Sequence, residues 1–139
     1  MKKKKQTRLR SIEIIEQYGG YAFFKTTIPN LFGTNFKATS IEVVENLIEA
    51  SKQFTKEALR QYTIAMMNRP DATDVLKDQQ LPVLFILGTE DIAAPLNDVL
   101  QQTYLPQCSY IHVLKEVGHM GMLEATNEMN EYLLEFISK

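Results

Sequence analysis

The most informative stretch of the sequence lies between residues 82 and 91 and reads PVLFILGTED. Residues 82–87 form an unbroken apolar run, and Gly88 ends it. A short apolar run with β-branched residues is typical of a strand that is buried on both faces, as in a parallel sheet. Residues 89–91 then form a polar loop at the carboxyl end of this predicted strand.

The sequence that follows this strand alternates between helical and extended patterns. We expect a helical stretch from Pro95 to Tyr104, a second strand over residues 109–117 and a final helix over about residues 127–138. Strand, helix, strand and helix in this order predict parallel strands joined by right-handed crossovers. Residues 81–139 are therefore expected to form an α/β segment.

Residues 1–80 are predicted to be mostly helical. Apolar residues recur every three positions between residues 8 and 18, which indicates an amphipathic helix. The Gly19-Gly20 pair is expected to end it, because glycine readily adopts the left-handed conformation found at helix ends. Residues 21–28 are expected to form a second short element.

Two helix starts are predicted between residues 39 and 68. The sequence Thr39-x-x-Glu42 has the spacing of a capping box and is expected to open one helix. Thr55 is expected to cap the next helix, over residues 56–68, before Pro70 ends it.

Composition sets limits on location and partners. With 45% hydrophobic residues and a net charge of −2, the 139 residues suit one globular domain and offer no excess positive charge for nucleic acid. Cys108 is the single cysteine, so no disulfide forms within the chain and a reducing, cytoplasmic compartment is expected. No apolar run reaches the roughly 18 residues of a membrane span. The basic residues 2–5 are interpreted as a solvated chain end.

An acid and a base follow the two predicted strands. Asp91 lies just after the first strand, and His119 follows the second within Gly118-His119. If the strands are neighbours, the two side chains lie at the same edge of the sheet, where α/β proteins place their ligands. A carboxylate that accepts a hydrogen bond from a histidine ring N–H fixes the tautomer of the ring and prepares it to act as a general base.

Both loops resemble those of the α/β-hydrolases. The stretch from Leu81 to Pro95 resembles the family's strand that ends in the catalytic acid, and VGHMGMLE (117–124) resembles its histidine loop. The acid precedes the histidine, as the family's chain order requires. The resemblance implies a partial α/β-hydrolase fold, with residues 81–139 as the C-terminal part of the core and residues 1–80 as a helical cap-like segment.

The resemblance further implies roles for single residues. Asp91 and His119 would be the acid and the base of a catalytic triad. Met120 and Met122 would either contribute to the substrate pocket or fill the core. Helices 41–50 and 56–68 would roof that pocket. No Gly-x-Ser-x-Gly nucleophile sequence and no His-Gly oxyanion loop occur within the chain, so a preceding part would have to supply them.

Other readings of these residues remain open. Asp91 also suits the cap of the helix that follows it, and Glu90 is a rival acid that is better interpreted as a solvated neighbour. His112 is interpreted as a structural or surface histidine inside a strand. Cys108 and Ser109 lack the sequence context of a nucleophile. Two histidines and one cysteine give no metal-ligand spacing, and no cofactor is expected.

Three functions are compatible with the sequence. The first is a fragment of a serine-type hydrolase that acts on a small ester- or amide-like acyl substrate, needs a nucleophile from elsewhere and is inactive alone. The second is a non-catalytic half-fold that forms a homo-oligomer through its exposed strand edge or its cap helices. The third is an unrelated small α/β protein that binds an anion at Gly88–Asp91 and Gly118-His119.

Overall fold

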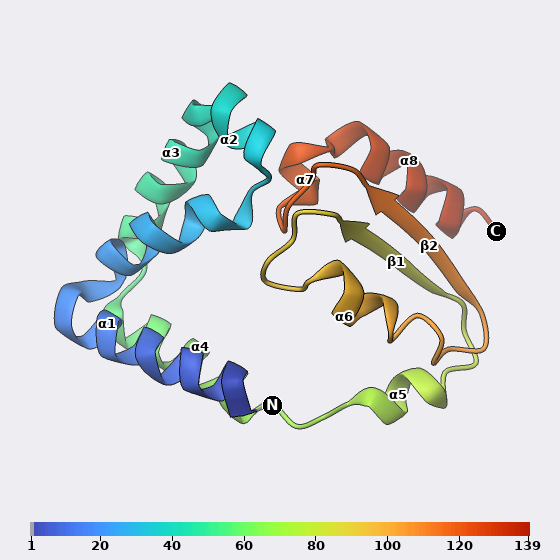
Figure 1. Cartoon of the computed structure of the whole chain (residues 1–139), viewed down its shortest axis with the longest axis horizontal. Helices are drawn as coiled ribbons and strands as arrows, with labels where there is room; N and C mark the ends of the chain where they lie inside the picture. The colour runs from blue at the N-terminus through green and yellow to red at the C-terminus, as the bar shows by residue number, and fades with distance from the viewer. Residues whose placement is uncertain (1) are drawn as a thin grey trace. The chain divides into compact units, whose positions relative to one another are not determined.

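The protein is described by a computed structural model, which covers the backbone from residue 2 to residue 139 and the side chains from Lys5 onward. The side chains of most of the basic run at residues 2–5 therefore lie outside the described residues. The chain divides into two compact units (Figure 1). Unit 1 holds the residues up to Pro29 and Ser40–Pro70, and unit 2 holds Asn30–Thr39 and Asp71–Lys139.

Unit 2 is built on two parallel strands, as the sequence predicts. Strand β1 (Val83–Gly88) pairs with β2 (Ser109–Leu114). Val83 lies opposite Ser109 and Gly88 lies opposite Leu114, so both strands end at the same level. The loops that follow β1 and β2 therefore begin side by side.

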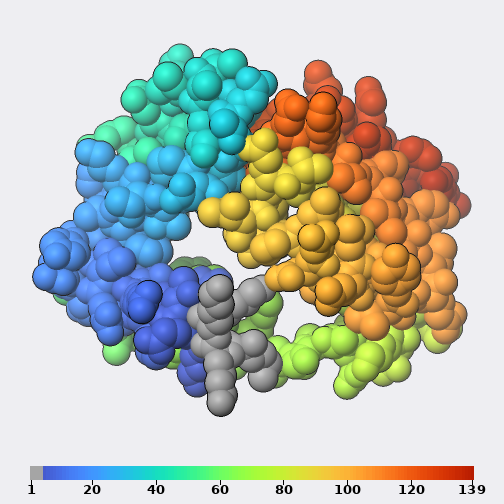
Figure 2. Space-filling model, viewed as in Figure 1, coloured from blue at the N-terminus to red at the C-terminus, as the bar shows by residue number. Residues whose placement is uncertain are grey.

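Helices on both sides of the sheet position these loops. Helix α6 (Leu96–Leu100) lies against β1, and α8 (Thr126–Ile137) packs along β2 on the other side (Figure 1). In the space-filling view, the residues coloured yellow to orange, which follow β1 in the sequence, form part of the visible face of unit 2 (Figure 2). Unit 2 also contains three short helices: α2 (Thr34–Thr39), α5 (Thr73–Lys77) and α7 (Gly121–Glu124).

The core of unit 2 lies beneath the loops. Leu114, Val117 and Ala125 are buried, and Ile86 and Met129 pack against them. Away from this core the sheet is less covered than the continuous apolar sequence suggests, because only the last two residues of β1 are buried. The sheet contains two strands among the described residues, so β1 has a paired edge toward β2 and an edge without a strand partner.

Unit 1 consists of helices. Its core residues are Ile15, Ile28, Val44 and Leu59. Its elements are α1 (Lys2–Thr27), the start of a 3-10 turn η1 (Ile28–Leu31), α3 (Ile41–Ala50), a 3-10 turn η2 (Ser51–Gln53) and α4 (Lys56–Asn68).

The predicted helix end at Gly19-Gly20 is a kink in α1. Gly19 has φ 84° and ψ 166°, so the first helical stretch does stop there. The chain then resumes a helix up to Thr27, which is the second element predicted from the sequence. The left-handed φ is one that glycine adopts without strain.

One of the two predicted caps is confirmed and the other is wrong. The Thr55 side chain accepts a hydrogen bond from Ala58 N at 3.1 Å and caps α4. Thr39, in contrast, is the last residue of α2, and its hydroxyl donates to Asn35 O at 3.1 Å. The helix that begins at Ile41 has Ser40 at its N-cap position, without a side-chain cap. Among the described residues, no helix is long and apolar enough to cross a membrane.

Candidate active site

The first part of the candidate site is the loop after β1, residues 89–94, which we call the acid loop. Within it, Asp91 Oδ1 accepts hydrogen bonds from Ala93 N and Ala94 N, each at 2.8 Å. One carboxylate oxygen is thus engaged by the loop's own backbone. The other oxygen, Oδ2, is free to face the neighbouring loop.

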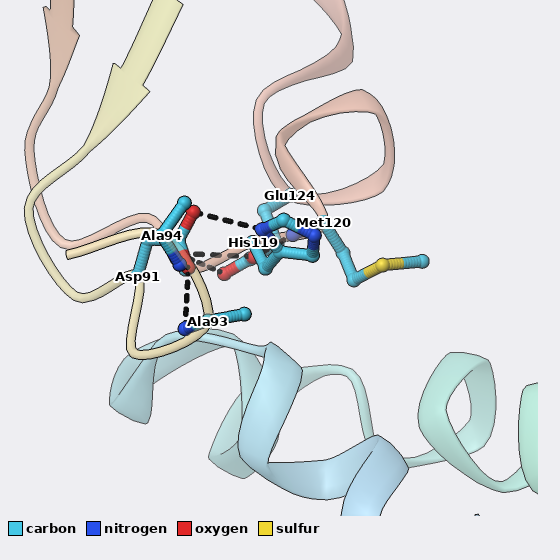
Figure 3. Close-up of polar contacts among 7 residues, drawn as sticks. Asp91, Ala93, Ala94, His119, Met120 and Glu124 are labelled. Carbon is cyan, nitrogen blue, oxygen red and sulfur yellow. Dashed lines mark hydrogen bonds and ion pairs between the residues drawn. The ribbon is translucent and has the colours of Figure 1, made fainter. Parts of the chain in front are cut away.

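That neighbour is the histidine loop, residues 117–120, which follows β2. His119 Nδ1 lies 2.8 Å from Asp91 Oδ2 (Figure 3). An ionised carboxylate has only acceptor sites, so Nδ1 is the donor of this hydrogen bond, and in the neutral ring Nε2 is left as an acceptor. The two residues that the sequence predicts to meet at the strand ends do meet there.

Close backbone packing holds the two loops together. A Cβ atom on Gly88 would lie 2.4 Å from both Val117 O and Gly118 O, so glycine is required at this position. Two backbone hydrogen bonds add to this contact: Thr89 N donates to Leu114 O at 3.0 Å, and Glu90 N donates to Val117 O at 2.9 Å. The spacing between Asp91 and His119 is therefore set by backbone contacts.

The two members of the pair differ in exposure. The Asp91 side chain is 11% exposed, whereas the His119 side chain is 45% exposed. A cavity of about 320 Å³ opens beside them and runs along β1, with Leu84–Gly88 and Val99 in its wall. The histidine is thus the member of the pair that a reacting molecule can reach.

The two methionines predicted to line a pocket lie in different places. Met122 lines the cavity and is half exposed. Met120 is not among the lining residues, and its side chain extends away from the Asp91–His119 hydrogen bond (Figure 3). Of the two predicted methionines, Met122 therefore lies in the wall of the cavity and Met120 does not.

Glu90 is a solvated neighbour of Asp91, as the sequence suggests, and it also has a specific partner. Its carboxylate accepts a hydrogen bond from Thr34 N at 2.6 Å, and this bond holds the pKa of Glu90 below its ordinary value of 4.5. The contact ties the acid loop to the start of α2. Glu90 is directed toward Thr34, and Asp91 is the carboxylate that meets His119.

Glu124 is a site residue that the sequence reading did not single out. From the end of α7 its carboxylate accepts hydrogen bonds from Gly118 N and Met120 N, the residues on either side of His119. Gly33 N donates to the same carboxylate at 2.7 Å. The Glu at the end of the VGHMGMLE stretch is the available sequence signal, but its partners depend on the fold.

Other nucleophile candidates lie at the wrong end of the sheet. Cys108 and Ser109 precede or begin β2, and the six residues of that strand separate them from the histidine loop by roughly 17 Å. Ser109 Oγ also donates to Thr103 O. His112 stacks on Tyr132 with 3.7 Å between the ring centroids, as a structural histidine would.

Comparisons with known proteins place this arrangement in a fold family. No protein-family model matches the sequence, and neither does any curated protein. Solved structures do match. A thermophilic esterase from Thermogutta terrifontis superposes on 98% of this chain with a TM-score of 0.87, at 22% identity over 50% of the esterase.

Two further solved structures show the same relationship. The enol-lactonase from Burkholderia xenovorans covers 96% of this chain with a TM-score of 0.86, at 16% identity and over 51% of the lactonase. The bromoperoxidase from Bacillus anthracis covers 96% of this chain with a TM-score of 0.83, at 17% identity and over 49% of the peroxidase. The chain spans about half the length of the structures that it matches. The chain therefore has the fold of the C-terminal half of an α/β-hydrolase.

Proposed function

We propose that this chain supplies the acid and the base of a serine-type α/β-hydrolase that acts on a small ester- or lactone-like acyl substrate. Asp91 is the acid and His119 is the base. The nucleophile and the oxyanion-binding groups come from an N-terminal half of the fold, either earlier in the same polypeptide or on another one. On its own the chain has the base without the group that the base activates.

The chemistry follows from the hydrogen bond between the pair. With its proton on Nδ1 and directed to Asp91, the neutral ring of His119 keeps Nε2 as a proton acceptor, and His119 lines the cavity. Nε2 would take the proton from a serine hydroxyl as the serine oxygen bonds to the acyl carbon. It would then return that proton to the departing alcohol, while Asp91 stabilises the imidazolium between the two steps.

One observation carries this proposal above all others. A single carboxylate oxygen points at His119 because the other oxygen is held by two backbone amides. A surface ion pair would not need this fixed orientation. An acid that must hold a base in one tautomer does need it.

Two observations support the proposed class of substrate. Structures with this fold include an esterase and an enol-lactonase, and both names denote enzymes that act on ester bonds. The cavity beside His119 is mostly apolar, with Leu87, Val99 and Met122 in its wall. A short acyl chain suits such a wall better than a charged group does.

The test begins with the coding DNA that precedes residue 1. We expect an open reading frame that carries a Gly-x-Ser-x-Gly sequence, and hydrolysis of p-nitrophenyl butyrate by the longer polypeptide. In that polypeptide His119→Ala should lower kcat by about 10²–10⁴-fold. His112→Phe is the matched control, because it removes the other histidine and keeps a ring against Tyr132.

Two results would contradict the proposal. One is an active longer polypeptide that is indifferent to His119→Ala. The other is robust turnover by residues 1–139 alone, which contain no Gly-x-Ser-x-Gly sequence. In either case the chemistry would have to come from other groups.

A homo-oligomer without catalytic activity is the second candidate. The edge of β1 without a strand partner and the exposed apolar side chains Ile111, Val113 and Leu134 favour it, because unpaired edges and apolar patches promote association. Light scattering at micromolar concentration separates the two. A stable dimer that the N-terminal half does not dissociate would favour the oligomer, and a monomer would argue against it.

A further inference from the structure

The carboxylate of Glu124 lies at the centre of a backbone hydrogen-bond cluster. Oε1 accepts from Gly118 N at 3.1 Å and from Met120 N at 3.2 Å. Oε2 accepts from Gly118 N at 3.1 Å and from Gly33 N at 2.7 Å. Hydrogen bonds to a carboxylate are stronger than those to a neutral acceptor, so this cluster is a firm support.

The amide between these donors is fixed as well. His119 N donates to Leu31 O at 2.7 Å. Three consecutive amides, 118 to 120, therefore each have a partner, and two of them share Glu124. The third amide, His119 N, bonds to Leu31, and the segment that contains Leu31 also bonds to Glu124 through Gly33 N.

The two segments are in direct backbone contact at this point. A Cβ atom on Gly118 would lie 2.6 Å from Leu31 O and 2.7 Å from Gly33 N. Glu124 bridges the two segments, because its Oε2 accepts hydrogen bonds from both glycine amides. Loss of the carboxylate would leave amides in a crowded region without an acceptor, which is costly when water cannot replace it.

We infer that Glu124 is a positioning residue, which holds the backbone of the histidine loop so that His119 stays within hydrogen-bonding distance of Asp91. Asp91 is oriented by its own loop, through Ala93 N and Ala94 N. The His119 side chain is 45% exposed, so the surrounding side chains enclose it only in part. Its position therefore depends on the backbone that carries it, and Glu124 holds that backbone on both sides.

The test replaces Glu124 with an isosteric group that lacks one acceptor. In Glu124→Gln, an NH₂ group faces at least one amide that now has no acceptor. Glu131→Gln is the matched control, since Glu131 is an exposed residue of α8 and the charge change is the same. Both variants and the wild type are compared as residues 1–139, without any need for catalytic activity.

The readout is amide and ring-proton exchange by NMR. We expect the Gly33, Gly118 and Met120 amides and the His119 Nδ1 proton to exchange at least about tenfold faster in Glu124→Gln, with α8 amides unchanged. Glu131→Gln should exchange like the wild type. Should Glu124→Gln not fold, Glu124→Asp retains the charge but shortens the side chain, and the same comparison applies.

Two outcomes would overturn the inference. In the first, the His119 Nδ1 proton exchanges at the wild-type rate although the three amides are released. In the second, all amides of unit 2 accelerate together, which means that Glu124 stabilises the fold without a particular effect on His119.

The catalytic consequence rests on the proposed function. In an active longer polypeptide, Glu124→Gln should lower kcat by about tenfold or more and leave KM nearly unchanged, because the ring is misplaced and the cavity wall is intact. If the longer polypeptide proves inactive, the proposed function fails, and the exchange experiment still decides the role of Glu124.

Discussion

Replacement of Gly88 by alanine tests how the acid loop and the histidine loop are held together. The new Cβ would lie 2.4 Å from Val117 O and 2.4 Å from Gly118 O, about 1 Å inside normal contact. Both atoms belong to the backbone, so neither can rotate away. The end of β1 or the histidine loop has to move.

The loss of unfolding free energy follows from the overpacking and from the hydrogen bond that such a movement would stretch. Val117 O, which the new Cβ would push away, also accepts the hydrogen bond of Glu90 N at 2.9 Å. Overpacking of this kind costs about 1–3 kcal/mol, and a lost hydrogen bond adds about 1 kcal/mol. We therefore expect Gly88→Ala to lower the free energy of unfolding of unit 2 by about 3 kcal/mol.

Gly121→Ala is the matched control for this experiment. Its Cβ would lie 2.8 Å from Met129 Sδ, the end of a flexible side chain that can move aside. We expect a cost below about 1 kcal/mol. Both histidines lie in unit 2, so urea unfolding followed through their NMR signals reports on this unit alone. An equal loss of unfolding free energy in Gly88→Ala and Gly121→Ala would refute the packing described for Gly88.

Three further predictions concern other supports of the fold. Thr55→Ala removes the cap of α4 and should cost unit 1 about 1 kcal/mol in urea unfolding followed by circular dichroism. Leu114→Ala opens the core of unit 2 and should cost about 3 kcal/mol by the histidine signals. Glu90→Gln should destabilise unit 2 at neutral pH. The folded-state pKa of Glu90 lies below that of an ordinary glutamate. Its hydrogen bond to Thr34 N therefore stabilises the folded state fully at pH values above the ordinary glutamate pKa. This stabilisation is lost as the pH falls through the lower folded-state pKa. The difference from wild type should therefore shrink in acid, and a constant difference would contradict it.

Local sequence signals predicted the elements that depend on local forces. The apolar run that ends at Gly88 is a strand, and the cap at Thr55 begins a helix. Asp91 and His119 could be paired because parallel strands end at the same edge, so strand order alone brings the two loops together. These predictions needed no knowledge of distant contacts.

The sequence was a poorer guide where two helices compete for one residue or where the partner of a residue is distant in the chain. The spacing at Thr39 suits a capping box, but α2 extends through Thr39 and engages its hydroxyl. The role of Glu124 could not be predicted from the sequence, because one of its partners, Gly33, lies 91 residues away. Its role depends on a backbone approach that composition and periodicity do not encode.

The most direct test of the candidate site is the protonation of the His119 ring. Proton–nitrogen NMR of the neutral ring, at about pH 9, distinguishes the two tautomers. In the wild type we expect the proton on Nδ1. In Asp91→Asn, the amides of Ala93 and Ala94 should keep the asparagine oxygen at the Oδ1 position and turn its NH₂ group toward His119. The proton should then move to Nε2, with the fold retained. A wild-type ring with its proton on Nε2, or a ring that Asp91→Asn leaves unchanged, would contradict the assignment of Asp91 and His119 as acid and base.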